Sequence, residues 1–126
     1  MKYGDIPVGD ISIFLAVKLA SPAPKFHVCV APGAFFLVNT RAIWQGSLPI
    51  LKEEFPFLEY DSFIGCGHLI QYPLEDEVQG YGRRGKLSAG LLNKLILHLN
   101  REVKSLSRAQ YRMVARHLMK LSKAPT

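Results

Sequence analysis

The chain has 126 residues, of which 48% are hydrophobic, 10% aromatic and 21% charged, a composition typical of one compact globular domain and not of a disordered tail. Its two cysteines, Cys29 and Cys66, have no C-x-x-C spacing, which excludes a disulfide framework, a zinc ribbon and a thioredoxin-type site and indicates a reducing, cytoplasmic setting. Residues 1–78 carry five basic and nine acidic side chains, a net charge of −4, whereas residues 79–126 carry eleven basic and one acidic side chain, a net charge of +10.

Short strands separated by turn residues are expected in the N-terminal body, residues 1–78. Apolar and polar residues alternate over 11–19 and 26–30, and residues 34–39 follow a Pro-Gly turn and would complete a hairpin. Two more strands are expected at 60–66 and 68–72, with a bend at the glycines between them. About five strands in this length indicate a small β-barrel. Lys18 interrupts the first apolar stretch, so neither a signal peptide nor a membrane span is expected there.

The composition of residues 79–87 predicts a flexible, basic connector between the strands and the helices. It holds three glycines together with Arg83, Arg84 and Lys86. The glycine spacing matches neither a phosphate-binding P-loop nor a dinucleotide fingerprint, so a linker is the simpler interpretation.

From residue 88 the hydrophobic period changes to about 3.6, which predicts two helices over 88–122. Ser88 is expected to cap the first helix, and a leucine-rich face would pack on the sheet. Ser107 with Gln110 predicts a capping box at the start of the second helix, flanked by a hydrophobic staple of Leu106 and Tyr111. The whole chain is therefore predicted to be a single α+β domain.

The last predicted helix carries four basic residues at intervals of four: Arg108, Arg112, Arg116 and Lys120. Like charges at this spacing repel one another, so an anionic partner such as nucleic acid would explain them. The alternatives are a solvated helix face with long basic side chains, or a patch that docks an acidic protein. Arg41 and the three cations of the connector are the other candidate contacts to nucleic acid.

The four histidines are scattered and no H-E-x-x-H spacing occurs, so no metal and no other cofactor is expected. A cysteine and a histidine two residues apart occur twice, but buried cysteines at such positions usually only pack. Polar side chains at the strand ends are stronger candidates for a catalytic site. An amine, an imidazole and a hydroxyl on neighbouring strands can stabilise and protonate a phosphodiester without a metal, although each alone also fits turn chemistry.

Three runs, KFHVCV at 25–30, FFLVNT at 35–40 and FPFLEYDSFI at 55–64, resemble the pattern of MazF/PemK-like toxins, particularly their phage- and plasmid-borne relatives. The sequence GKLS at 85–88, the leucine-rich helix and the Leu-Ser start of the last helix are similar to the C-terminal part of those relatives. The resemblance covers about residues 25–120.

This resemblance implies an SH3-like barrel with appended helices, often as a homodimer, and a cytoplasmic toxin that cleaves single-stranded RNA without a metal. An acidic antitoxin protein would be its partner. Thr40 matches the family's hydroxyl position, Lys25 stands where the family has an arginine, and His27 would assist as acid or base. The alternative is a non-catalytic relative that binds nucleic acid or a protein.

Overall fold

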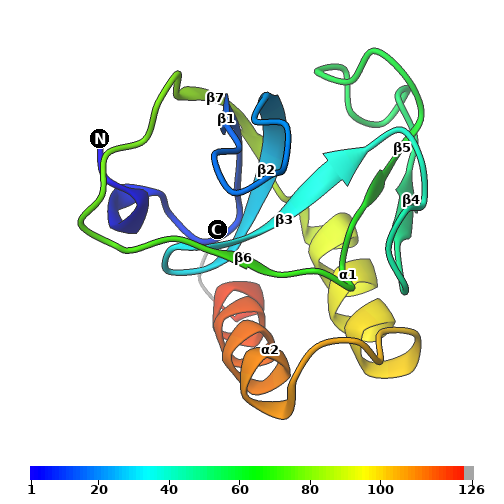
Figure 1. The fold of residues 1–126 in the computed structure, drawn as a ribbon. Coiled ribbons are helices and arrows are strands. Elements are labelled where there is room, and N and C mark those ends of the chain that lie inside the picture. Colours follow the sequence, from blue (N-terminus) through cyan, green and yellow to red (C-terminus); the bar gives the residue numbers. More distant parts are fainter. Residues whose placement is uncertain (124–126) are drawn as a thin grey trace.

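A computed structural model describes residues 1–123 as an antiparallel sheet followed by two α-helices, which confirms the predicted α+β class (Figure 1). In chain order the elements are the 3-10 helix η1 (Tyr3–Asp5), β1 (Asp10–Leu15), β2 (Pro24–Ala31), β3 (Ala34–Asn39), β4 (Leu48–Ile50), β5 (Ser62–Ile64), β6 (Ile70–Gln71), β7 (Gly82–Lys86), α1 (Ala89–Arg101) and α2 (Arg108–Ser122).

The strands follow the order β4-β5-β3-β2-β1-β7. Strand β3 is central, because β2 pairs with one of its edges while β5 and β6 pair in succession with the other. The amide of Gly65 still donates to the carbonyl of Leu37 on β3, and the chain then bulges out of the β3 ladder before β6 begins, near the glycines where the sequence predicts a bend. Within residues 1–123 the edge strands β4 and β7 are not paired with each other, so the sheet is open.

Both helices pack against one face of the sheet. Their apolar side chains share a buried cluster with Ile11, Val28 and Phe36 of β1, β2 and β3. The predicted caps are confirmed: Ser88 Oγ accepts a hydrogen bond from the amide of Leu91, and Ser107 forms a reciprocal capping box with Gln110. The buried leucines of α1 and the buried valine and leucine of α2 follow the expected helical period: Leu91, Leu92, Leu95, Leu99, Val114 and Leu118.

The opposite face of the sheet is also buried, under η1 and the chain that follows β6. Tyr3 of η1 stacks on Tyr72 with ring centroids 4.1 Å apart, and its amide donates to the carbonyl of Asp76. Beneath them lie Phe14 of β1 and Phe35 of β3, both fully buried. The sheet therefore separates an aliphatic core on the helix side from a smaller, aromatic core on the other side.

The strands differ from the sequence-based prediction in number and length: there are seven in residues 1–123 where about five are predicted, and those predicted at 60–66 and 68–72 are shortened to Ser62–Ile64 and Ile70–Gln71. The first strand ends at Leu15 and not near residue 19, because the chain turns after it. Strand β4 lies between the strands predicted at 34–39 and 60–66, where the sequence pattern predicts none. The predicted flexible connector is wrong for Gly82–Lys86, because this segment is β7 and pairs antiparallel with β1. No helix formed by residues 1–123 has the length and apolar character needed to cross a bilayer.

Candidate nucleic-acid interface

The three predicted catalytic residues do not gather around one accessible point. Lys25 and His27 lie two residues apart on β2 and so share its aromatic-core face. Thr40 is exposed in the bend just beyond the end of β3. Lys25 is half-buried and pairs in register with Phe14. The hydroxyl is thus at the surface beyond the end of β3, whereas the imidazole is in the core.

His27 is completely buried inside the aromatic core. Its ring lies 3.5 Å from that of Phe14, centroid to centroid. Because a carbonyl only accepts, Nδ1–H must donate to the carbonyl oxygen of Lys25 at 2.9 Å, and Nε2 then accepts from the hydroxyl of Tyr72 at 3.4 Å. Burial lowers the pKa of His27 to about 4, and the bond to Lys25 only partly opposes this. The predicted role of His27 as acid or base does not fit this position, since a substrate does not reach it.

The two cysteines are free thiols in the core, and both are fully buried. Burial raises the pKa of Cys29 and of Cys66 to about 12, so both thiols stay protonated near neutral pH. Neither is a nucleophile in this setting. Within residues 1–123 no three side chains of the His, Cys, Asp and Glu types come together as ligands for a metal ion.

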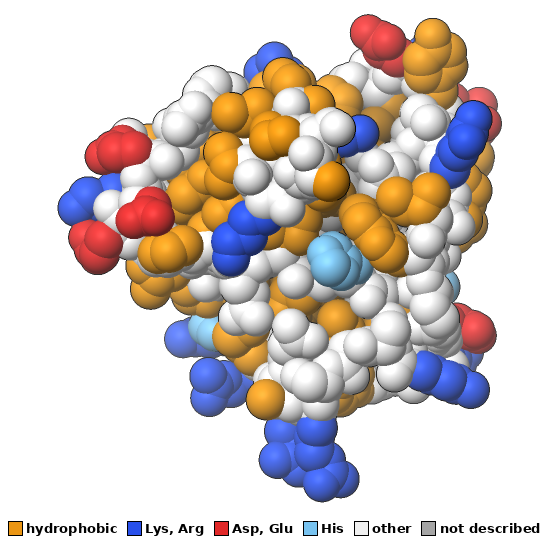
Figure 2. Space-filling view, viewed as in Figure 1, with side chains coloured by type: hydrophobic (Ala, Val, Ile, Leu, Met, Phe, Trp, Pro, Cys, Tyr) orange, Lys and Arg blue, Asp and Glu red, His pale blue; other side chains and the backbone are white. Residues whose placement is uncertain are grey.

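The predicted basic stripe on α2 is exposed along its whole length: Arg108, Arg112, Arg116 and Lys120. The ion pairs found in residues 1–123 are Met1–Glu77, Lys2–Glu75 and Arg83–Asp10, so none of them neutralises the stripe. Helix α2 itself contains no acidic residue. The pKa of His117 is lowered, first by partial burial and then by the charges of Arg116 and Lys120. Figure 2 shows basic side chains gathered over α2, at the lower end of the molecule.

The other predicted cations divide into three settings. Arg83 on β7 donates from Nε to the Asp10 carboxylate at 3.0 Å, so part of its charge is used within the fold. Arg84 and Arg41 are exposed. Lys86 lines a cavity of about 310 Å³ together with Leu121 of α2, which places this lysine beside the end of the basic helix.

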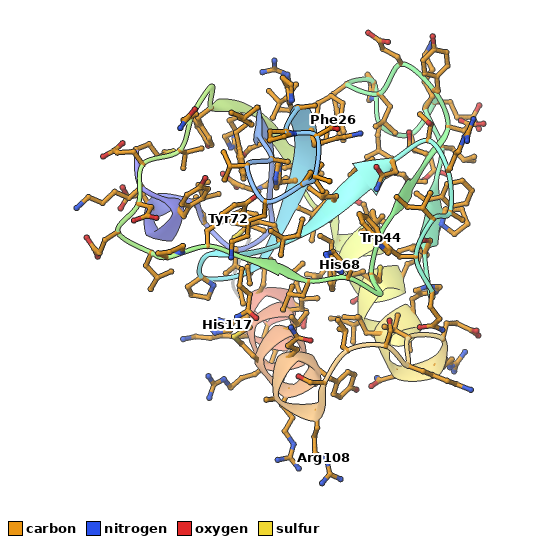
Figure 3. The ribbon with its side chains drawn as sticks, in the orientation of Figure 1. Phe26, Trp44, His68, Tyr72, Arg108 and His117 are labelled. Atoms are coloured by element: carbon orange, nitrogen blue, oxygen red, sulfur yellow. The ribbon has the colours of Figure 1, made fainter. Side chains whose placement is uncertain are left out.

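A further surface feature was not assigned from the sequence. Trp44, in the loop after β3, stacks on His68 with ring centroids 4.9 Å apart and an interplanar angle of 16° (Figure 3). His68 lies next to a groove of about 370 Å³ that Lys18 also lines. The signal that could have identified it is that the chain's one tryptophan occurs in a loop between predicted strands and not on the face of a strand or helix.

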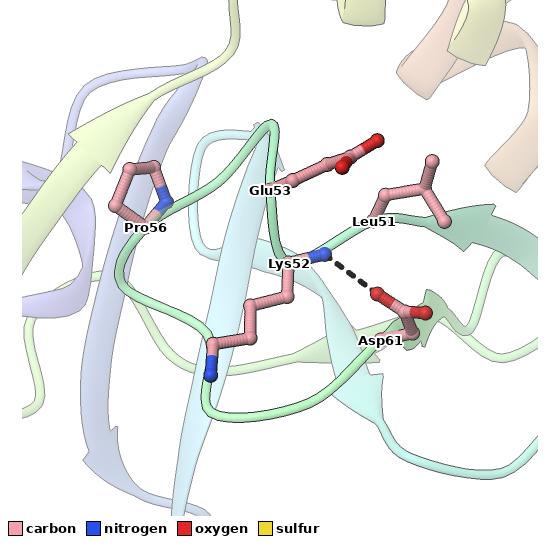
Figure 4. Close-up of a pocket in the computed structure, with 5 residues that line it drawn as sticks. All are labelled: Leu51, Lys52, Glu53, Pro56 and Asp61. Carbon is pink, nitrogen blue, oxygen red and sulfur yellow. Dashed lines mark hydrogen bonds between the residues drawn. The ribbon is translucent and has the colours of Figure 1, made fainter.

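A larger hollow of about 570 Å³ lies over the loop between β4 and β5, with Leu51, Lys52, Glu53, Pro56 and Asp61 around it (Figure 4). The Asp61 carboxylate accepts a hydrogen bond of 2.8 Å from the backbone amide of Lys52. This bond closes the loop, which is the turn chemistry expected of an aspartate at a strand end. The mixed charges around the hollow favour no class of ligand.

Comparison with protein families, with curated proteins and with solved structures gave no match to this chain. The geometry and the resemblance of the sequence runs are therefore the grounds for a function.

Proposed function

We propose that this protein binds single-stranded RNA through α2, as a MazF/PemK-like module. The observation that carries the proposal is the unneutralised basic stripe on this helix. Its four cations are exposed, have no acidic neighbour on the helix and take part in none of the ion pairs of residues 1–123.

The stripe is unfavourable for the free protein. Each pair of like charges at i and i+4 destabilises a helix by about 0.2 to 0.5 kcal/mol. Phosphates along the stripe would remove this repulsion, and each contact would release counterions from the RNA, which adds to affinity at low salt. Lys86, near the far end of α2, would extend the same surface toward the sheet.

The SH3-like barrel belongs to the same proposal. Two irregularities in strand register support it, one between Ile11 and Ser12 on β1 and one between Cys29 and Ala31 on β2. Bulges of this kind bend a sheet toward closure. The homodimer and the acidic antitoxin implied by the resemblance are also proposed, and light scattering of the purified protein, alone and with an acidic partner, measures both.

The experiment is a titration of fluorescently labelled single-stranded RNA by anisotropy, in EDTA. We expect Arg112→Glu with Arg116→Glu to weaken binding at least about tenfold at low salt, since both substitutions replace phosphate contacts by repulsion. The matched control is Lys94→Glu with Arg101→Glu, two exposed positions of α1 with the same change in net charge. Equal losses in both variants would mean that net charge alone attracts RNA, and the α2 site would be wrong.

The same samples show whether the RNA is cut. The resemblance implies a metal-independent endoribonuclease, for which Lys25 and Thr40 are the remaining candidates because His27 is buried. Fragments that disappear with Lys25→Ala and with Thr40→Ala would assign an enzyme. RNA that is bound with a steep salt dependence but stays intact would support the alternative, a non-catalytic relative that binds nucleic acid.

A further inference from the structure

The stack of Trp44 and His68 is built in layers. A Cβ on Gly65 would overlap the six-membered ring of Trp44, so the glycine is needed for the indole to lie this close to the sheet. His68 stacks on Trp44 and is exposed. Among residues 1–123 its imidazole has no hydrogen-bond partner, whereas His27 and His98 are both hydrogen-bonded through their rings. The His68 ring is therefore stacked on Trp44 through one face, and its other face has no stacking partner among these residues.

The groove beside this stack combines an apolar floor with a cation. Its floor contains Leu69 and Ile70, which are nearly buried. Lys18 stands on its wall, where Nζ donates to the carbonyl of Gln71 and lies 5.5 Å from the centroid of the Tyr72 ring. An aromatic face, an apolar floor and a fixed positive charge suit one unpaired base with its phosphate.

The groove is joined to the basic helix. The side chain of Gln110, in the first turn of α2, donates to the side chain of Gln71 at 3.4 Å. Gln71 lines the groove, and Gln110 is two residues from Arg108, where the stripe begins. In Figure 3 Arg108 extends from the lower end of α2, and His68 and Trp44 lie above it in the middle of the view.

We propose that His68, supported by Trp44, is a stacking platform for one unpaired base of the RNA, and that Lys18 holds a neighbouring phosphate. This inference rests on the proposed function, because the stripe on α2 would hold the adjacent backbone. It goes further in that it gives one unpaired base of that strand a binding position on the protein. A duplex has its bases paired and would not offer one to the ring.

The test uses a short oligoadenylate RNA and an abasic strand of equal length, which carries the same phosphates without bases. The intact protein should bind the RNA more tightly than the abasic strand, and the emission of Trp44, its single tryptophan, should change with the RNA alone. Base stacking of this kind contributes enough that His68→Ala should weaken RNA binding by about five- to a hundredfold. The salt dependence should stay the same, because stacking releases no counterions.

The conservative variant is His68→Phe, which keeps a flat ring against Trp44 and should keep most of the affinity. If the protein binds both strands equally and His68→Ala has no effect, the platform is wrong while RNA binding through α2 stands. If neither strand binds, the proposed function fails and the platform with it. Preference for a duplex of equal length would also contradict an unpaired base.

Discussion

Two histidines in this protein lie against aromatic rings, and they differ in what surrounds them. The ring of His27 is 3.5 Å from Phe14, and both of its nitrogens are hydrogen-bonded inside the aromatic core. The ring of His68 is 4.9 Å from Trp44 and is open to solvent on its outer side. The same side chain is thus part of the core in one place and available to a ligand in the other.

The difference arises from position in the sheet. His27 lies on β2 between β1 and β3, under a face that η1 and the chain after β6 cover. His68 lies in the bulge between β5 and β6, where Gly67 leaves room for the carbonyl of Gln45. A histidine in the middle of a covered sheet stabilises the fold, and one in an exposed bulge can contact a partner.

The largest expected effect is on stability, and it comes from the aromatic core around His27. Phe14→Ala should lower the free energy of unfolding by about 3 to 5 kcal/mol, because its fully buried ring contacts Tyr3, His27, Phe35 and Tyr72. Urea denaturation followed by circular dichroism measures it. The control is Leu97→Ala, at a leucine of α1 that is 51% exposed, and a loss of similar size there would contradict a packed aromatic core.

The next effect is a dependence of stability on pH. The pKa of His27 is about 4 in the folded protein, against an ordinary value of 6.5 in the unfolded chain. Between these values the unfolded chain takes up a proton that the folded protein does not. Stability should therefore fall as the pH is lowered from 6.5 to 4, by up to about 3 kcal/mol.

Denaturation midpoints measured across this pH range test the sign. The control is His68→Gln, which should keep the same fall in stability because His68 is at the surface. A variant without the buried imidazole, His27→Gln, should lose most of the fall even if it is less stable at every pH. A flat profile for the unmodified protein would show that His27 is not buried as a neutral ring.

A smaller effect on stability is expected at the stack of Trp44 and His68. Gly65→Ala should cost about 1 to 3 kcal/mol, because the added Cβ forces the Trp44 ring away. Emission from Trp44 should shift at the same time, while the aromatic core stays intact. The matched control is Gly90→Ala in α1, where a Cβ meets open space and alanine should raise stability by about 0.5 to 1 kcal/mol. Unchanged Trp44 emission in Gly65→Ala would contradict the layered stack.

The smallest effect concerns the helix that carries the basic stripe. Ser107→Ala removes the cap of α2 and should cost about 1 kcal/mol. Ser21→Ala, in an exposed turn, is the control and should change stability by less than about 0.5 kcal/mol. If the two substitutions have equal effects, the capping box contributes nothing in solution.

Local features of the fold could be predicted from the sequence, and non-local ones could not. The capping box of Ser107 and Gln110 is confirmed. It could be predicted because its two partners are only three residues apart in the sequence. Strand β7 was missed because it holds two glycines and three cations and no alternating apolar pattern. Its pairing with β1, 69 to 76 residues earlier in the chain, makes it a strand.

The candidate site could be predicted only in part for the same reason, because its surroundings depend on non-local contacts. Alternation along β2 places Lys25 and His27 on one face, but it does not show what covers that face. The cover comes from the first residues and from the chain after β6, and only the fold brings them over His27. The pairing of Trp44 with His68 likewise depends on a bulge and a loop that meet only in three dimensions.

The most direct test of the central claim is the salt dependence of RNA binding, measured for the unmodified protein and for Arg112→Glu with Arg116→Glu. If α2 contacts about four phosphates, the logarithm of affinity should fall with the logarithm of salt concentration with a slope near −3, and the variant should flatten it by about 1 to 1.5. An unmodified slope near zero, or a variant with the same slope and affinity, would contradict the assignment of α2 as the RNA-binding helix.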